Sequence, residues 1–230
     1  MSLSSEAPIP PTTDPGRATR VQILATEHWS LLSHRSLTYT ESLARVNIFL
    51  AILSGAVVAL ALVAQVDHFG RTFTVVAIPV LLVVFLTGLG TISRLVALNR
   101  DDYRWIVGMN RLRHAYLTMY PDLEPYFTTG FTDDLPGALK TLGIDATAGR
   151  HLGSIIRHLP NTLPGMLSTI VAAVAAAIAA LLGQTVGLPF WAVAILALAA
   201  FLVTLGALTL RGRRSFRRSS PGLEPRFPTR

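Results

Sequence analysis

The chain has 230 residues, of which 51% are hydrophobic and only 14% are charged, and its formal net charge is +7. Soluble domains contain roughly 25% charged residues, so this composition argues against an ordinary soluble fold. Cysteine is absent, which excludes disulfides, thiolate zinc sites and cysteine nucleophiles.

The apolar residues are gathered into charge-free segments. Two such segments lie on either side of the sequence DHFGRT, and a longer one is divided by GQTVGLP. A membrane-spanning helix needs about 20 apolar residues, and the glycines and proline supply a turn. We therefore predict an all-α integral membrane protein with four transmembrane helices in two hairpins, at residues 46–66, 73–93, 164–183 and 189–210.

Basic residues are distributed very unevenly around these spans. The turn DHFGRT holds one arginine and the turn QTVGL holds none, whereas the segments at the other ends of the spans hold the rest. Because cytoplasmic flanks are enriched in Lys and Arg, both termini and the central segment are expected in the cytoplasm.

The basic run RGRRSFRRSS follows the last span directly. It explains the high positive charge as a topological anchor, and no nucleic-acid-binding fold accompanies it, so a nucleic-acid partner is not expected. The bilayer itself, and anionic lipids in particular, are the expected partners. The arginines predicted to contact anionic lipid are Arg211, Arg213, Arg214, Arg217 and Arg218.

The rest of the chain is organised around the spans. Residues 1–16 are rich in Pro, Ser and Thr and are predicted to be disordered. Residues 17–119 form one long helical hairpin, residues 120–163 a cytoplasmic loop with short helices at 133–142 and 147–159, residues 164–210 the second transmembrane hairpin, and residues 211–230 a basic disordered tail.

Two stripes with alternating three- and four-residue steps flank the first pair of spans. Such a/d spacing is typical of coiled coils, so we predict that the first hairpin extends into a cytoplasmic antiparallel helical stalk. Core packing explains the stripes better than a cofactor site does. The residues predicted to pack in the stalk are Trp29, Leu32, Tyr39, Trp105, Met109, Leu112 and Tyr116.

Residues at equal distance from the DHFGRT turn should meet across the stalk. This arithmetic brings Arg35 to the level of Asp101 and Asp102. A charge at a stripe position needs a partner, so an Arg35–Asp102 or Arg35–Asp101 pair is expected to fix the register. The same arithmetic places Glu41 near Arg94 and Arg100.

Small residues recur at intervals of four on two of the spans, a pattern that lets membrane helices approach closely. They pack either within one subunit or between subunits, and the second alternative gives a homo-oligomer. These residues are Ala51, Gly55, Ala59, Ala172, Ala176 and Ala180.

No catalytic, phosphate-binding or metal-binding motif is found. Asp101 and Asp102 are adjacent in a predicted helix, so their side chains diverge by about 100° and do not chelate one ion. The spans contain no Asp, Glu, Lys, Arg or His, which argues against proton-coupled transport. We assign no catalytic residue, no cofactor and no metal.

Three stretches carry a resemblance to known sequences. ATEHWSLLSHRSLTYTESLARVNIFLAILSGAVVALALVAQ, RWIVGMNRLRHAYL and PDLEPYF resemble a group of uncharacterised multi-pass proteins from high-GC actinobacteria, over about residues 25–127. That resemblance implies a bacterial plasma membrane and no assigned activity. In architecture alone, the first hairpin is similar to two-span modules of bacterial conflict systems that are proposed to form pores.

These features favour a non-enzymatic multi-pass membrane protein that acts as a scaffold or interaction module through its stalk. The second interpretation is an oligomeric ion channel or pore-forming protein, with small-residue faces between subunits. The third is a membrane enzyme acting on lipid head groups.

Overall fold

A computed structural model describes residues 15–143, 162–217 and 224–229, and it contains no strand among them. Two very long helices open the chain, α1 (Pro15–Asp67, 53 residues) and α2 (Arg71–Met119, 49 residues). They are followed by a short 3-10 helix η1 (Pro121–Tyr126) and by α3 (Leu135–Thr141). The chain then forms α5 (Leu163–Thr185) and α6 (Phe190–Arg217).

Four of these helices, α1, α2, α5 and α6, are long and apolar enough to cross a membrane. The predicted spans 46–66, 73–93 and 164–183 lie within α1, α2 and α5, and the span 189–210 lies within α6 except for its first residue, Pro189. The apolar spans are only parts of longer helices, because α1 continues for some thirty residues before its span and α2 for about twenty-six after its own. We call residues 15–45 of α1 and 94–119 of α2 the polar half of the α1–α2 pair.

A tight turn at the sequence DHFGRT reverses the chain between α1 and α2. His68 and Phe69 adopt left-handed φ angles of 48° and 61°, a conformation that is uncommon outside glycine. Asp67 stabilises it, because its carboxylate accepts a hydrogen bond from the Phe73 amide at 2.6 Å and its carbonyl accepts one from the Gly70 amide at 2.8 Å. At the opposite end of the pair, the Arg17 guanidinium donates to the Met119 carbonyl, so the two helices reach about equally far.

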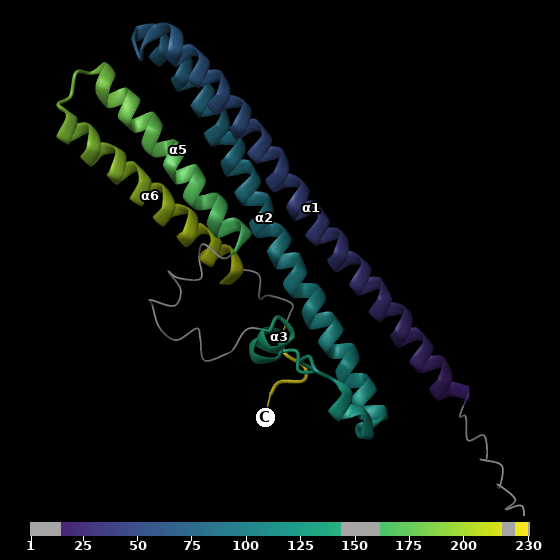
Figure 1. Ribbon diagram of the computed structural model, residues 1–230. Helices are drawn as coiled ribbons and strands as arrows, with labels where there is room; N and C mark the ends of the chain where they lie inside the picture. Colours follow the sequence, from purple (N-terminus) through teal and green to yellow (C-terminus); the bar gives the residue numbers. More distant parts are fainter. Residues whose placement is uncertain (1–14, 144–161, 218–223, 230) are drawn as a thin grey trace, which may run out of the picture.

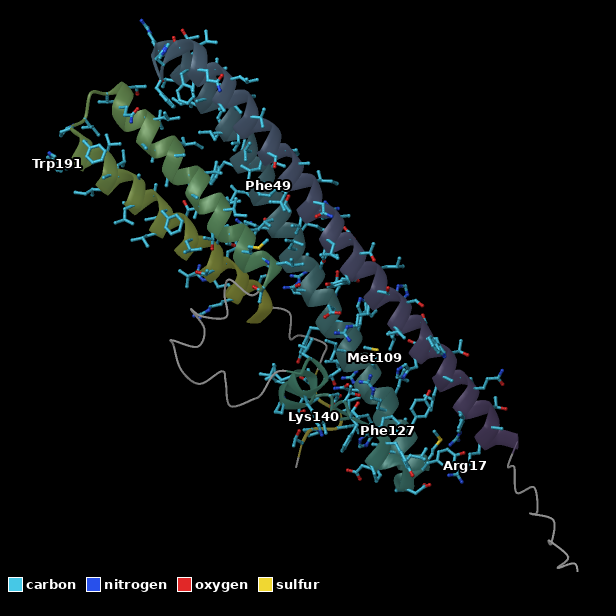
Figure 2. The ribbon with its side chains drawn as sticks, in the orientation of Figure 1. Arg17, Phe49, Met109, Phe127, Lys140 and Trp191 are labelled. Atoms are coloured by element: carbon cyan, nitrogen blue, oxygen red, sulfur yellow. The ribbon has the colours of Figure 1, made fainter. Side chains whose placement is uncertain are left out.

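The helices α5 and α6 lie beside only one half of the α1–α2 pair, the half next to the turn (Figure 1). The hydrophobic core sits there, and α5 packs against α2. Phe49, Leu95 and Leu167, from α1, α2 and α5, are almost completely buried in it, and Figure 2 shows Phe49 within this helical bundle. Gly88 permits the close approach, since a Cβ there would lie 2.4 Å from Cγ2 of Val171 and 3.0 Å from Cε2 of Phe49.

Several predicted segments outside the apolar spans differ from the structure or fall outside the described residues. The predicted helix at 133–142 is present as the shorter α3, because the carboxylate of Asp134 accepts from the Gly137 amide and caps the helix start. The predicted helix at 147–159 lies outside the described residues. So does most of the stretch predicted to be disordered, 1–16, but its last two residues, Pro15 and Gly16, are helical and begin α1. The expectation that residues 211–230 lack structure needs correction, because α6 continues to Arg217 and residues 224–229 bind elsewhere on the protein.

Candidate functional site

The polar half of the α1–α2 pair is held together by two sets of ion pairs. Arg35 Nε donates to Oδ1 of Asp102 at 2.8 Å. Closer to the apolar half, the Glu41 carboxylate accepts two hydrogen bonds from Arg94 at 3.0 and 3.1 Å and one from Arg45 at 2.8 Å. Of the two aspartates proposed for the register pair, Asp102 meets Arg35, whereas Asp101 contacts Arg104 of its own helix at 3.4 Å.

The predicted packing stripe on α1 needs correction, because it is displaced by one residue. Trp29, Leu32 and Tyr39 are 69%, 41% and 63% exposed. The side chains that face α2 instead are one position earlier, and Leu31 is the buried one among them at 9% exposure. Successive helix positions point about 100° apart, so a displacement of one residue turns the whole aromatic stripe to the surface.

The residues of the predicted packing stripe on α2 do lie between α1 and α2 or beneath the loop that follows α2. Met109 is 1% exposed and packs with Leu31 and Ile106, and Figure 2 shows it on the polar half, well beyond α5 and α6. Leu112 and Trp105 border this cluster. The rings of Trp105 and His34 stack with centroids 5.1 Å apart.

Tyr116 lies further along α2, where its ring centroid is 6.3 Å from that of His28. The His28 ring therefore takes a place in the interface that the prediction gave to Trp29. Burial, and secondarily the positive charge of Arg113, lowers the pKa of His28.

A buried amide fastens the loop after α2 to the helix. Asn110 is completely buried, and its Nδ2 donates to the Thr132 carbonyl at 2.8 Å. Its Oδ1 accepts from the Thr141 hydroxyl at 2.9 Å and from Arg113 at 2.8 Å. Because a buried polar group is costly unless paired, this network fixes the loop and α3 against α2.

Asp133, also on that loop, binds the C-terminal part of the chain. Its side chain is fully buried, and Oδ1 accepts from the Phe227 amide at 2.7 Å. Oδ2 accepts from the Arg226 amide and from Arg111 Nε, both at 2.8 Å. The Asp133 amide in turn donates to the Phe227 carbonyl at 3.3 Å, so one aspartate binds the backbone of a segment that bends at Arg226 and Phe227.

Further contacts flank this aspartate. Arg111 Nη2 donates to the Glu224 carbonyl at 3.0 Å, and Asp134 Oδ2 accepts from the Thr229 amide at 2.8 Å. The rings of His114 and Phe227 stack with centroids 4.1 Å apart. We call residues 224–229 the tail segment, and Arg111, His114, Asp133 and Asp134 the tail site.

The charges of the tail site are stabilised by these contacts. Burial by itself raises the pKa of Asp133, but hydrogen bonds from the Arg226 amide, the Arg111 guanidinium and the Phe227 amide outweigh it, so the pKa lies below its ordinary value. The pKa of Asp134 is lowered in the same way, chiefly by Thr229 against the effect of burial. Both carboxylates are therefore ionised at neutral pH and suited to accept backbone N–H groups.

A cavity of about 540 Å³ opens beside the tail segment. It lies between the ends of α1 and α2, with Ile23 and Leu24 on one side, Ala115 and Met119 on the other, and Phe227 at its edge. The lining is mainly apolar, so the tail site continues into a surface that suits a further hydrophobic side chain.

The remaining predicted site residues lie elsewhere. Arg211, Arg213 and Arg214 are exposed near the end of α6, the side chain of Arg217 is not described, and Arg218 lies outside the described residues. The small residues divide into two groups. Ala172, Ala176 and Ala180 are buried or half-buried on α5, whereas Ala51, Gly55 and Ala59 are exposed on α1.

The tail site was not anticipated from the sequence. Its only local signals are the adjacent pair Asp133 and Asp134 ahead of Pro136, which marks a helix start, and an aromatic residue between prolines in EPRFPT. Nothing in either stretch indicates that they meet. Within the part of the chain that the structure describes, no group of three or more His, Asp or Glu side chains is placed to hold a metal ion.

Comparisons with known proteins do not assign this chain to a family. No protein-family model, no curated protein and no solved structure matches it. Its function must therefore be inferred from the geometry described above.

Proposed function

We propose that this protein is a non-enzymatic, multi-pass membrane protein that serves as a scaffold or interaction module. The polar half of the α1–α2 pair is its cytoplasmic antiparallel stalk, and the membrane is the plasma membrane of a bacterium. The observation that carries the proposal is the tail site, which binds a short helix-free polypeptide segment through its backbone and one aromatic ring.

The tail site has the features of a peptide-recognition site. Backbone hydrogen bonds supply affinity and are independent of sequence, whereas a ring pocket selects a side chain. The partner that fits is a segment of the same chemistry as the tail segment, with an aromatic residue next to proline and a bend at that residue. The exposed Trp29 and Tyr39 of α1 add apolar surface of the kind enriched at protein interfaces.

The orientation follows from charge. The stalk and the end of α6 carry the arginines, and both termini are proposed to be cytoplasmic. Reporter fusions at Gly16 and Pro221 should read cytoplasmic, and a tag at Gly187 should read external. A periplasmic signal at either terminus would contradict this orientation.

Peptide binding tests the interaction module. The protein without residues 224–230 is incubated with the fluorescent peptide LEPRFPTR, and binding is followed by anisotropy. Saturable binding is expected, and Asp133→Asn should weaken it by at least about tenfold. Both oxygens of Asp133 accept hydrogen bonds, and the asparagine amide replaces one of them with an NH2 group, which faces another donor in either orientation of the side chain. A peptide with alanine in place of phenylalanine should also bind more weakly.

The matched control is Asp122→Asn, which makes the same charge change at an exposed position on η1. It should leave peptide affinity unchanged. Absence of saturable binding, or equal affinities for the Asp133→Asn and Asp122→Asn proteins, would overturn the assignment of the tail site as an interaction site.

One observation favours the second candidate, an oligomeric channel or pore. Gly55 lies on an exposed side of α1, and a Cβ built there meets no heavy atom within 4 Å. The face formed by Ala51, Gly55 and Ala59 is thus not used by the described helices, and small faces support close helix contacts in membranes.

Oligomeric state in mild detergent tests that alternative. If this face joins subunits around a pore, Gly55→Leu should dissociate the oligomer and abolish conductance in planar bilayers. Val57→Leu, at an exposed position on the opposite side of the same helix, should do neither. A protein that is monomeric and non-conducting without any substitution excludes the channel.

A further inference from the structure

A second site lies where the apolar half of the protein ends. Arg100 of α2 and Arg213 of α6 line one cavity of about 220 Å³, together with Ser168 and Thr209. A neighbouring cavity of about 190 Å³ is lined by Arg100 and Arg211. None of the residues that line these two cavities is acidic.

Arg100 is the unusual member of this group. Its Nε atom is buried and has no hydrogen-bond partner. Among the residues that the structure describes, Arg100 takes part in no ion pair, in contrast to Arg94 six residues earlier. A buried donor without a partner costs free energy, and a positive charge raises that cost, so an anion in this cavity would offset it.

The position of the cavity indicates which anion. It lies between the last apolar turns of α2 and α6 and the first turn of α5, where Thr162, Pro164 and Gly165 form part of its wall. The positive end of the α5 dipole therefore adds to the arginine charges. At this boundary between apolar and polar surface, a bilayer places the phosphate groups of its lipids.

We propose that Arg100 and Arg213 form a binding site for the phosphate head group of an anionic phospholipid. Ser168 and Thr209 line the same cavity, but their hydroxyl groups already donate to the Pro164 and Gly206 carbonyls of their own helices, so the arginines are the donors to the phosphate. This differs from diffuse attraction between a basic tail and the membrane, because the ligand binds inside a defined cavity and involves an arginine of α2. Arg214 is adjacent in sequence but does not line either cavity. The proposal rests on the membrane placement given under Proposed function.

The test uses the purified full chain in a neutral detergent. Phosphatidylglycerol, phosphatidylcholine and inorganic phosphate are added in separate arms, and bound lipid is counted by native mass spectrometry. One phosphatidylglycerol per chain is expected to be retained. Arg100→Gln and Arg213→Gln should each lower its affinity about tenfold or more, because each removes a charge-assisted hydrogen bond.

Arg214→Gln is the matched control, since it removes the same charge from the same helix. It should change affinity by less than about threefold, as expected for screened attraction by an arginine that lines neither cavity. Equal effects of Arg213→Gln and Arg214→Gln would show diffuse attraction only and overturn the site. Inorganic phosphate that competes at the lipid's own concentration would assign the site to a free anion and overturn the lipid.

A protection experiment keeps the proposal testable if the Arg100→Gln protein does not fold. Asn99→Cys places one thiol at the cavity in a chain that has no other cysteine. Phosphatidylglycerol should slow its labelling by a charged maleimide at least threefold, and phosphatidylcholine should not. Equal labelling rates with both lipids overturn this inference, whereas a failure of the reporter fusions described above would instead overturn the membrane placement.

Discussion

Arg35 of α1 and Asp102 of α2 meet across the helix interface, with Arg35 Nε 2.8 Å from Asp102 Oδ1. Both side chains are 31% exposed, so water screens the pair only in part. A shift of one helix along the other by a single turn would separate the two groups by about 5 Å. The pair therefore favours one lengthwise register of the polar half.

The first prediction concerns the strength of this pair. In a double-mutant cycle with Arg35→Ala and Asp102→Ala, the coupling free energy is expected to be about 0.5–1 kcal/mol, because the pair is partly exposed. Unfolding by sodium dodecyl sulfate, followed by circular dichroism, gives the four free energies. Asp101→Ala serves as the control and should show no coupling with Arg35→Ala.

A second prediction tests which side of α1 faces α2. A Cβ at Gly108 would lie 3.0 Å from Cδ1 of Leu31, so Leu31→Cys and Gly108→Cys should form a disulfide within one chain under mild oxidation. The pair Leu32→Cys and Val107→Cys should not, since Leu32 is 41% exposed and Val107 is fully buried. Gel mobility with and without reductant reads out both pairs, and preferential crosslinking of 32 to 107 would favour the packing stripe predicted from the sequence.

Close approach of α2 to α5 leads to the third prediction. Gly88→Ala inserts a methyl group 2.4 Å from Cγ2 of Val171, and overpacking of this kind costs about 1–3 kcal/mol. Gly90→Ala is the control, because a Cβ at Gly90 meets nothing within 4 Å. This substitution should leave stability unchanged or raise it slightly. Thermal unfolding of the two proteins should separate them, and the additional change Val171→Ala should restore part of the loss caused by Gly88→Ala.

The fourth prediction is a pH dependence at Glu41. Hydrogen bonds from Arg94 and Arg45 lower the pKa of its carboxyl from 4.5 to about 2. A carboxyl with a lowered pKa in the folded state stabilises the protein fully above its unfolded pKa and loses this contribution as pH falls towards the folded pKa. The difference in unfolding midpoint between the native protein and Glu41→Gln should thus be constant above about pH 4.5 and shrink between pH 4.5 and 2. A difference that stays constant down to pH 2 would contradict it.

Several features of this protein were determined by the sequence alone. The apolar segments are as long as a bilayer is thick, which requires helices because a membrane core offers the backbone no other partner. Counting residues outward from the DHFGRT turn at a fixed helical rise also placed Arg35 level with Asp101 and Asp102, and Glu41 near Arg94 and Arg100. Of these candidates, Asp102 pairs with Arg35 and Arg94 pairs with Glu41. Depth along a helix depends only on the number of residues, so it can be read from the sequence.

The tertiary structure decided which side of each helix faces inward. Trp29 and Leu31 lie on different sides of α1, and both are apolar enough to be buried. The stripe that contains Trp29 and the stripe one position earlier, which contains Leu31, have the same periodicity, so periodicity alone does not choose between them. Which side of α1 faces α2 depends on the α2 side chains at the same depth along the pair. Gly108 leaves space for Leu31, and Arg35 reaches Asp102 only from the same side.

Only the tertiary structure could bring Asp133 to the amides of Arg226 and Phe227, more than ninety residues away along the chain. Backbone amides look alike in any sequence, so an aspartate that binds them leaves no complementary side chain for a pattern to detect. The site arises because Asn110 fixes the loop on α2 and leaves Asp133 buried beside Arg111. The cavity around Arg100 arises in the same way, from three helices whose arginines and hydroxyl groups carry no shared spacing in the sequence.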